Sequence, residues 1–296
     1  FLVGSRSTTP PIEKIDVAWP KPWIFFRAFV ATVIVFLFFH FAWRTFENPM
    51  LVPGLIITGS FAMPLSTLIL FVELNARHNV SMFQVSKMVI VGGLVAMIIS
   101  LLLFEVSDAI TLDWLGRSIG GLVEEPAKVL ALLLVAGLPR YKYILNGLLF
   151  GAAIGAGFAA FESAGYAFVT GVATMDPDLM TTTILFRGLL SPLGHIVWTA
   201  MCGGMLWKVK GDQLFRFGML LDRRFLRVLA IAIVLHMIWN SPLQLPFLGK
   251  YLVLGLVAWV VVLALVSEGL HELLQEKARF LSAHDGASAT LHPEVQ

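Results

Sequence analysis

Two neighbouring carboxylates and an ammonium group interrupt a stretch of the chain that is otherwise almost wholly apolar. Glu124, Glu125 and Lys128 lie between Arg117 and Arg140, an interval just long enough to cross a ~30 Å hydrocarbon core at about 1.5 Å per residue. A charge at such depth costs at least about 2.5 to 3.5 kcal/mol, so these side chains should face other helices or a wet cavity. They form either a buried ion pair that fixes helix packing or part of a site that activates water.

Ionisable and polar residues recur in three later apolar stretches. Glu162 and Tyr166 stand four residues apart in the first, His195 lies in the second, and His236 and Asn240 stand four apart in the third. Two histidines with several carboxylates are the ligand types of a catalytic zinc site, which keeps one coordination position open. A glutamate and a histidine could also deprotonate water without a metal. Either scheme would hydrolyse an amide.

The depth of these residues in their predicted spans is similar. Glu124, Glu162, His195 and His236 lie seven or eight residues from the outer ends of their spans, and the residues taken as those ends are Arg117, Thr170, Arg187 and Gln244. At about 1.5 Å per residue, all four side chains lie ~10 to 12 Å below the outer surface. We therefore predict one site in the outer half of the bilayer, built from the fourth to seventh spans.

Composition identifies a membrane protein. The 296 residues are 58% hydrophobic and 14% charged, with a mean hydropathy of +0.84, whereas soluble domains contain about 25% charged residues. The single cysteine, Cys202, excludes an internal disulfide framework and a Cys-based zinc site, so any metal ligands must be His and carboxylate. A net charge of +2 gives no indication of nucleic-acid binding.

Apolar runs of spanning length predict an all-α polytopic membrane protein, a bundle of about eight transmembrane helices. The runs are residues 23–43, 51–72, 88–107, 118–138, 144–170, 188–207, 226–244 and 251–270. Sixteen Lys and Arg fall in segments on one side and four on the other, which predicts cytoplasmic N- and C-termini. Gly147, Gly151 and Gly155 form a stripe that should let another helix approach closely.

The same pattern divides the chain into five parts, with an interfacial amphipathic helix expected over residues 211–225. The parts are a cytoplasmic N-terminal segment (1–22), a three-helix scaffold (23–110), a catalytic four-helix core (111–245), a C-terminal transmembrane helix (246–274) and a disordered tail (275–296).

These motifs resemble those of the PrsW family of intramembrane proteases, in the superfamily of CAAX-prenyl endopeptidases and bacteriocin-processing enzymes. The matching pieces, in the family's order, are Glu124-Glu125-x-x-Lys128, Phe161-Glu162-x-x-x-Tyr166, His195, and His236-x-x-x-Asn240. The resemblance covers residues 117–245 and leaves the first three spans outside it. A histidine found in the second motif of the prenyl endopeptidases is not matched here, so their metal-free scheme transfers poorly.

The resemblance implies peptide hydrolysis within a bacterial cytoplasmic (inner) membrane, near its outer face. The expected partners are membrane lipids and a single-span or lipidated membrane protein substrate, such as an anti-sigma factor, and no nucleic acid. The first motif's glutamates and the later histidines are expected to be essential.

We expect a zinc-dependent endopeptidase with Glu124 as general base, although Glu124 and Glu125 could exchange roles. Asn240 would donate to an oxyanion or orient a ligand, Lys128 would pair with a glutamate, and Tyr166 would support the site. The expected metal ligands are Glu125, Glu162, His195 and His236. A proton- or cation-coupled transporter that uses the same residues as a relay is the main alternative, and a non-catalytic membrane adaptor is a third.

Overall fold

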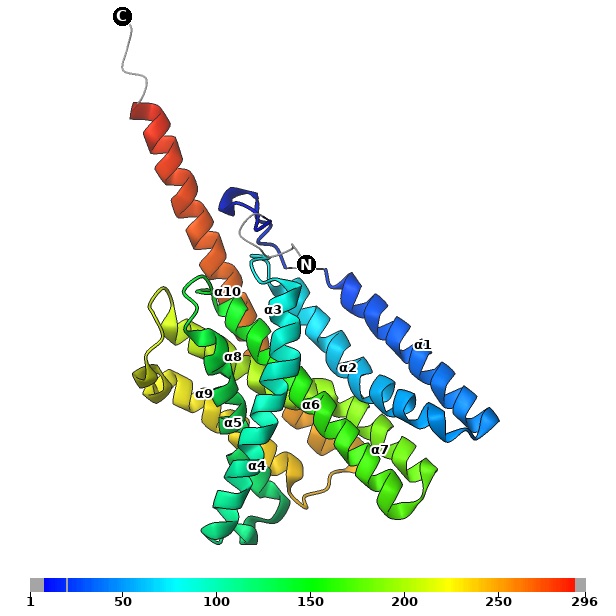
Figure 1. The fold of residues 1–296 in the computed structure, drawn as a ribbon. Coiled ribbons are helices and arrows are strands. Elements are labelled where there is room, and N and C mark those ends of the chain that lie inside the picture. Colours follow the sequence, from blue (N-terminus) through cyan, green and yellow to red (C-terminus); the bar gives the residue numbers. More distant parts are fainter. Residues whose placement is uncertain (1–7, 20, 291–296) are drawn as a thin grey trace, which may run out of the picture.

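The computed structural model describes residues 8–19 and 21–290, and these residues form a helical bundle (Figure 1). Helix accounts for 84% of the structure, and the described residues contain no strand, which confirms the predicted all-α class. The main helices are α1 (Trp23–Phe46), α2 (Val52–Leu74), α3 (Met82–Lys87), α4 (Gly93–Ala109), α5 (Ile119–Ala136), α6 (Ile144–Thr174), α7 (Pro177–Leu190), α8 (His195–Lys210), α9 (Arg223–Asn240) and α10 (Gly249–Thr290).

Six helical segments among the described residues are long and apolar enough to cross a membrane, which makes this a multi-pass membrane protein. They are Trp23–Phe46, Pro49–Leu74, Met82–Ala109, Ile144–Thr174, Pro177–Lys210 and Pro246–Ala283. Helices α5 and α9 also run through the bundle, but each carries three charged residues and falls outside this apolar group (Figure 1).

Helix α6 is the central element, since 94% of the residues in its most apolar stretch are buried inside the protein. A Cβ atom added at Gly147, Gly151 or Gly155 would lie 2.2 to 2.5 Å from a backbone oxygen of α8. The predicted glycine stripe therefore packs directly on the backbone of α8, as small residues do between membrane helices. The oxygen that faces Gly155 belongs to His195, so this contact also places a candidate ligand.

The third predicted span contains a π-helical turn, Met88–Gly92, between α3 and α4. This turn packs against α6, because a Cβ added at Gly157 would lie 1.9 Å from the backbone oxygen of Val89. Helix α6 thus contacts backbone on two of its faces, which explains its run of small residues.

The predicted span 188–207 is wrong in its boundaries, because the helix is interrupted near the start of this span, at residues 191–194. Pro192 supplies no backbone N–H and Gly194 has a non-helical conformation (φ −114°, ψ −126°), so α7 ends before them and α8 begins at His195. The preceding helix α7 was not predicted, although Asp176 carries a recognisable signal. Its carboxylate caps the helix by accepting from two backbone N–H groups, and a proline follows it.

The region around α9 also differs from the sequence prediction. Residues 211–225 do not form an amphipathic helix; Gly211, at φ +52°, ends α8, and only a short 3-10 helix, Phe217–Leu221, follows. Asp222 then caps α9, which begins at Arg223. At its other end, α9 stops at Asn240 instead of continuing to residue 244.

The predicted disorder from residue 275 is contradicted over residues 275–290, where α10 continues. Glu276 forms an ion pair with Lys142 at 3.1 Å, and Lys277 donates to the backbone oxygen of Ile15 at 2.8 Å. These contacts tie the extension to the rest of the protein. The remainder of the predicted tail, residues 291–296, lies outside the described residues, as do residues 1–7 and 20 of the predicted N-terminal segment.

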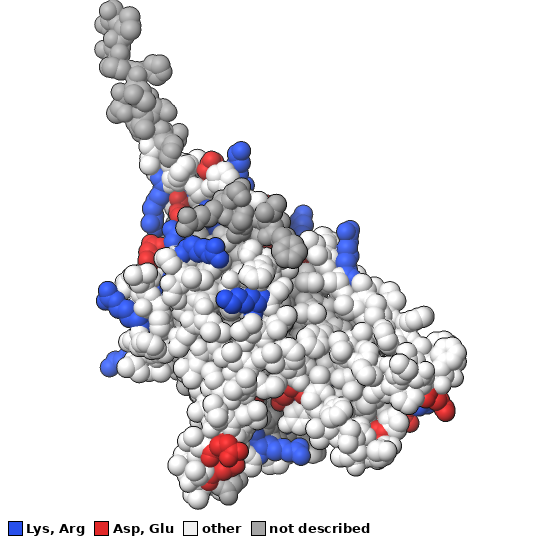
Figure 2. Space-filling view, viewed as in Figure 1, with Lys and Arg blue, Asp and Glu red and all other residues white. Residues whose placement is uncertain are grey.

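The basic residues on the visible face of the bundle are concentrated near one end. Figure 2 shows most Lys and Arg side chains of this face near the end from which α10 emerges, with an uncharged band below them. The N-terminal segment lies at that same end (Figure 1). The arrangement agrees with the charge pattern on which the predicted orientation depends.

We predict that Gly151→Ala lowers the stability of the protein by about 1 to 3 kcal/mol, because the added methyl group must push α6 and α8 apart. In the wild-type geometry its Cβ would lie 2.2 Å from the backbone oxygen of Thr199. Thermal unfolding of the detergent-purified protein measures the effect. Gly165→Ala, on the same helix with no atom within 4 Å of the added Cβ, is the matched control. Equal unfolding temperatures for the two variants would contradict the proposed tight contact.

Candidate active site

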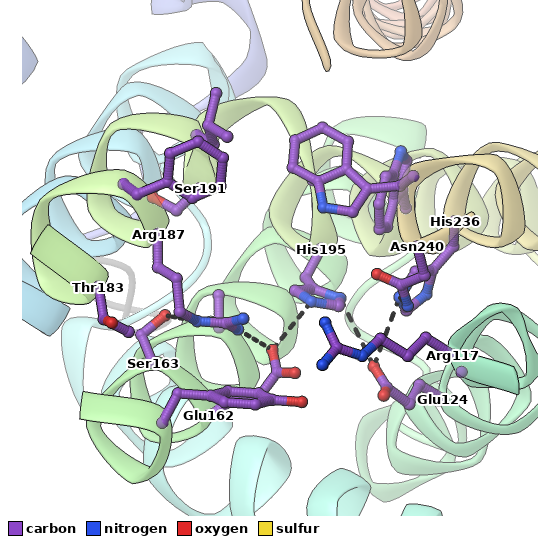
Figure 3. A pocket seen from close by; sticks show the side chains of 18 of the residues that line it. Arg117, Glu124, Glu162, Ser163, Thr183, Arg187, Ser191, His195, His236 and Asn240 are labelled. Atoms are coloured by element: carbon purple, nitrogen blue, oxygen red, sulfur yellow. Dashed lines mark hydrogen bonds and ion pairs between the residues drawn. The ribbon is translucent and has the colours of Figure 1, made fainter. Parts of the chain in front are cut away.

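One cavity of about 570 Å³ lies among α5, α6, α7, α8 and α9 and collects most of the polar side chains noted in the sequence. Glu124, Glu162, His195, His236 and Asn240 all line it, and Figure 3 shows them pointing toward a common space. Residues separated by more than one hundred positions therefore meet, as the shared depth in the sequence predicted.

The four residues do not, however, lie at the similar distances from the ends of their helices that the sequence predicted. Glu124 lies five residues after the start of α5, whereas Glu162 lies twelve residues before the end of α6. His195 is the first residue of α8, and His236 lies four residues before the end of α9. The helices end at different levels of the bundle, and the side chains converge because of packing between the helices.

Glu124 lies between the two histidines. Its Oε2 atom is 3.9 Å from Nδ1 of His195 and 3.8 Å from Nε2 of His236. This oxygen is buried and has no hydrogen-bond partner among the described residues. A buried, unpartnered carboxylate oxygen carries a large desolvation cost, which a cation bound beside it would offset.

The donor set fits a metal ion. Glu124, His195 and His236 each offer one ligand atom, and these atoms lie within 4.8 Å of one another. Two histidines and a carboxylate are the ligands of many catalytic zinc sites, with bonds of about 2.0 to 2.2 Å. Ligand atoms in such a tetrahedron are about 3.4 Å apart, so the three side chains would have to move closer together. Lys128, which contacts Nδ1 of His195, and Asn240, which contacts Nε2 of His236, would also have to turn away from these nitrogens to admit a metal.

Glu125 occupies a position behind the cavity and is not among its lining residues. Its Oε1 atom accepts from Nζ of Lys128 at 2.6 Å and from Nδ1 of His236 at 2.7 Å. An ionised carboxylate is only an acceptor, so this contact assigns the proton to Nδ1 and leaves the Nε2 lone pair facing the cavity. The geometry thus gives Glu125 an orienting position in place of the predicted ligand position.

Lys128 connects the first and third motifs. Its side chain is fully buried, and Nζ also lies 2.8 Å from Nδ1 of His195. The ammonium packs 4.9 Å from the centre of the Phe158 ring, a favourable cation–π distance. On its other edge, His195 Nε2 lies 3.0 Å from Oε2 of Glu162. Both ring nitrogens of His195 therefore have protein partners in this arrangement.

Asn240 and Trp198 fix the position of His236. The Asn240 amide donates to Nε2 of His236 at 3.0 Å, which is the nitrogen that would bind a metal. Trp198 stacks on the His236 ring at a centroid distance of 4.7 Å and meets His195 edge-on at 5.3 Å. The indole thus contacts both imidazoles and forms part of the cavity wall.

Sequence reasoning missed the role of Arg187, which it used only as a boundary residue. Arg187 forms an ion pair with Glu162 at 2.5 Å, donates to Ser163 at 3.1 Å, and lies 4.3 Å from the centre of the Tyr166 ring. Tyr166 lines the cavity, with 52% of its surface exposed, and contacts the arginine through its ring face. The sequence does show an isolated arginine eight residues before His195. Because helix α7 was not predicted, this arginine could not be assigned a position in the bundle.

The family comparison covers this whole site. A family model described as "PrsW family intramembrane metalloprotease" matches residues 80–266, which include the third predicted span that the motif resemblance left outside. The comparisons with curated proteins and with solved structures gave no match. The matched segment is well over half of the chain and contains every residue that lines this cavity. The chain thus belongs to the PrsW family and is an intramembrane protease.

Proposed function

We propose that this protein hydrolyses a peptide bond of a membrane-protein substrate, using a metal ion held by Glu124, His195 and His236. The buried, unpartnered Oε2 atom of Glu124 between two imidazoles is the observation that carries the proposal. Zinc is the ion that best suits two histidines and one carboxylate, and bound zinc lowers the pKa of its water to ~7. This assignment makes Glu124 a ligand in place of the general base expected from the sequence.

Glu162 becomes the candidate proton acceptor. Its Oε2 atom is held by Arg187 and His195, which fixes the carboxylate at the wall of the cavity. The second oxygen is left to accept a proton from a water molecule in the cavity and to return it to the leaving amine. The Asn240 amide, at 3.0 Å from His236, is placed to donate to the oxyanion that forms on the substrate carbonyl.

Glu125 and Lys128 support these groups from behind. Glu125 holds His236 in the tautomer whose lone pair lies on Nε2, where a metal would replace the Asn240 amide, and Lys128 balances the charge of Glu125 inside an apolar bundle. Such outer contacts typically change metal affinity by about 10- to 100-fold when they are removed. This division of roles explains why two adjacent glutamates can be required for different reasons.

The substrate enters, in our proposal, from the end of the bundle opposite the basic end. Arg117 and Thr170, which line the cavity, lie just before α5 and near the end of α6, away from the chain termini (Figure 1). With cytoplasmic termini and α5 and α9 as further membrane crossings, giving eight in all, this end faces outward. A single-span or lipidated protein in a bacterial inner membrane, of the anti-sigma-factor type, is the proposed substrate. The alternative of a coupled transporter would require access to these residues from both sides.

We predict that Glu124→Gln, His195→Ala and His236→Ala each remove bound zinc and lower cleavage of a co-expressed single-span reporter by at least about 100-fold, because each removes one of three ligands. Elemental analysis of the purified protein and reporter cleavage in cells are the measurements. Glu268→Gln, which breaks a surface ion pair with Lys208, is the control and should retain both properties. Full cleavage by the His195 variant would exclude that residue from the site.

We predict a different result for Glu125→Gln and Glu162→Gln, since neither residue supplies a ligand in this proposal. Glu125→Gln should bind zinc about 10- to 100-fold more weakly, and Glu162→Gln should retain zinc while losing cleavage. Competition with a zinc chelator gives the affinities, and reporter cleavage is measured at saturating zinc. Complete loss of zinc from Glu125→Gln, with normal zinc binding by Glu124→Gln, would restore the original ligand assignment.

A further inference from the structure

Arg117 differs from the other cations at the cavity end of the bundle. Arg44 and Arg187 form ion pairs with carboxylates at 2.7 and 2.5 Å, and the Lys250 ammonium donates to a backbone oxygen at 3.0 Å. Within the described part of the chain, the side chain of Arg117 makes neither a hydrogen bond nor an ion pair, although its backbone oxygen accepts from the N–H of Ile119. Its guanidinium is therefore not held by any side chain that the structure describes.

The Arg117 side chain is part of the lining of the active-site cavity. Arg117 lies in the 3-10 segment Asp113–Ser118, directly before α5, and is one of the residues that line the site. Figure 3 shows its side chain reaching into the cavity on the side where Glu124 and Glu162 lie. Arg117 is an exposed residue, so a substrate that enters from this end of the bundle can reach its guanidinium.

The charges that line the cavity do not balance once a divalent cation is bound. Arg187 offsets Glu162, and Glu124 offsets only one of the two charges of the metal. The guanidinium of Arg117, which forms no ion pair with a described side chain, adds another positive charge. An occupied cavity therefore has an excess of positive charge and favours a ligand that carries an anionic group.

A substrate carboxylate fits this requirement. Arginine presents a planar fork of N–H donors that binds carboxylates in bidentate geometry. A cavity of 570 Å³ is roughly 8 Å across, which corresponds to about two or three extended residues at ~3.3 to 3.6 Å each. A side chain held by Arg117 would thus lie within about three residues of the bond placed at the metal.

We propose that Arg117 is a specificity-determining residue that selects substrates with an Asp or Glu side chain within about three residues of the scissile bond. The inference rests on the proposed function, because it takes this cavity as the place of peptide hydrolysis. It identifies the substrate as a membrane protein with an acidic residue near its cleavage site, recognised by an ion pair with the enzyme.

The test uses a set of single-span reporter proteins in which each position around the cleavage site is in turn Asp, Asn or Lys. The cleavage site is first located by mass spectrometry of the products. For the wild-type enzyme we expect at least one position at which Asp gives about 10-fold faster cleavage than Asn, which corresponds to ~1.4 kcal/mol. Arg117→Gln should remove this preference, and Arg117→Glu should reverse it in favour of Lys.

The control variant is Arg44→Gln, which removes another arginine from the same end of the bundle but outside the active-site cavity and should keep the wild-type preference. The wild-type scan tests the inference even if the Arg117 variants fail to fold: Glu124-dependent cleavage with no acidic preference at any position overturns it alone. An acidic preference that persists in a folded, zinc-binding Arg117→Gln protein also overturns it. Cleavage that does not depend on Glu124 would overturn the proposed function and, with it, this inference.

Discussion

The buried contact of Lys128 with Glu125 and His195 is the constraint on which the site depends. None of the lysine side chain is exposed, and its ammonium lies 2.6 Å from the glutamate and 2.8 Å from the imidazole. Removing one member would leave an uncompensated charge in an apolar bundle, at a cost of about 3 to 5 kcal/mol in comparable buried pairs. The three side chains therefore fix α5 and α8 relative to one another while they orient the histidines of the cavity.

The glycine contact between α6 and α8 provides the complementary steric constraint. Because Gly155 meets the backbone oxygen of His195 directly, α8 can begin only where α6 has no side chain. Glu162 lies seven residues further along α6, close enough for its carboxylate to reach the ring of His195 at 3.0 Å. Small residues thus set the distance between two polar groups that would not meet if the helices were further apart.

The two adjacent glutamates illustrate how a helix divides one motif between two tasks. Successive residues on a helix point about 100° apart, so Glu124 faces the cavity while Glu125 faces Lys128 and the back of His236. The site consequently has an inner layer that can hold a metal and an outer layer that positions the inner one. Arg187 positions Glu162 in the same way on the opposite wall of the cavity, through an ion pair.

The sequence by itself determined the membrane class, the helical fold and the identity of most polar residues in the cavity. Charged residues are so costly within apolar spans that their positions alone indicated a shared site. It could not assign the roles of Glu124 and Glu125, since rotation about the helix axis is set by neighbouring helices. It also missed α7 and Arg187, and it misplaced several helix ends, among them the start of α8 and the ends of α9 and α10. The break at Pro192 has a local cause, whereas the packing of α6 on α8 and the pairing of distant charges depend on contacts between segments far apart in the chain, which no local pattern reveals.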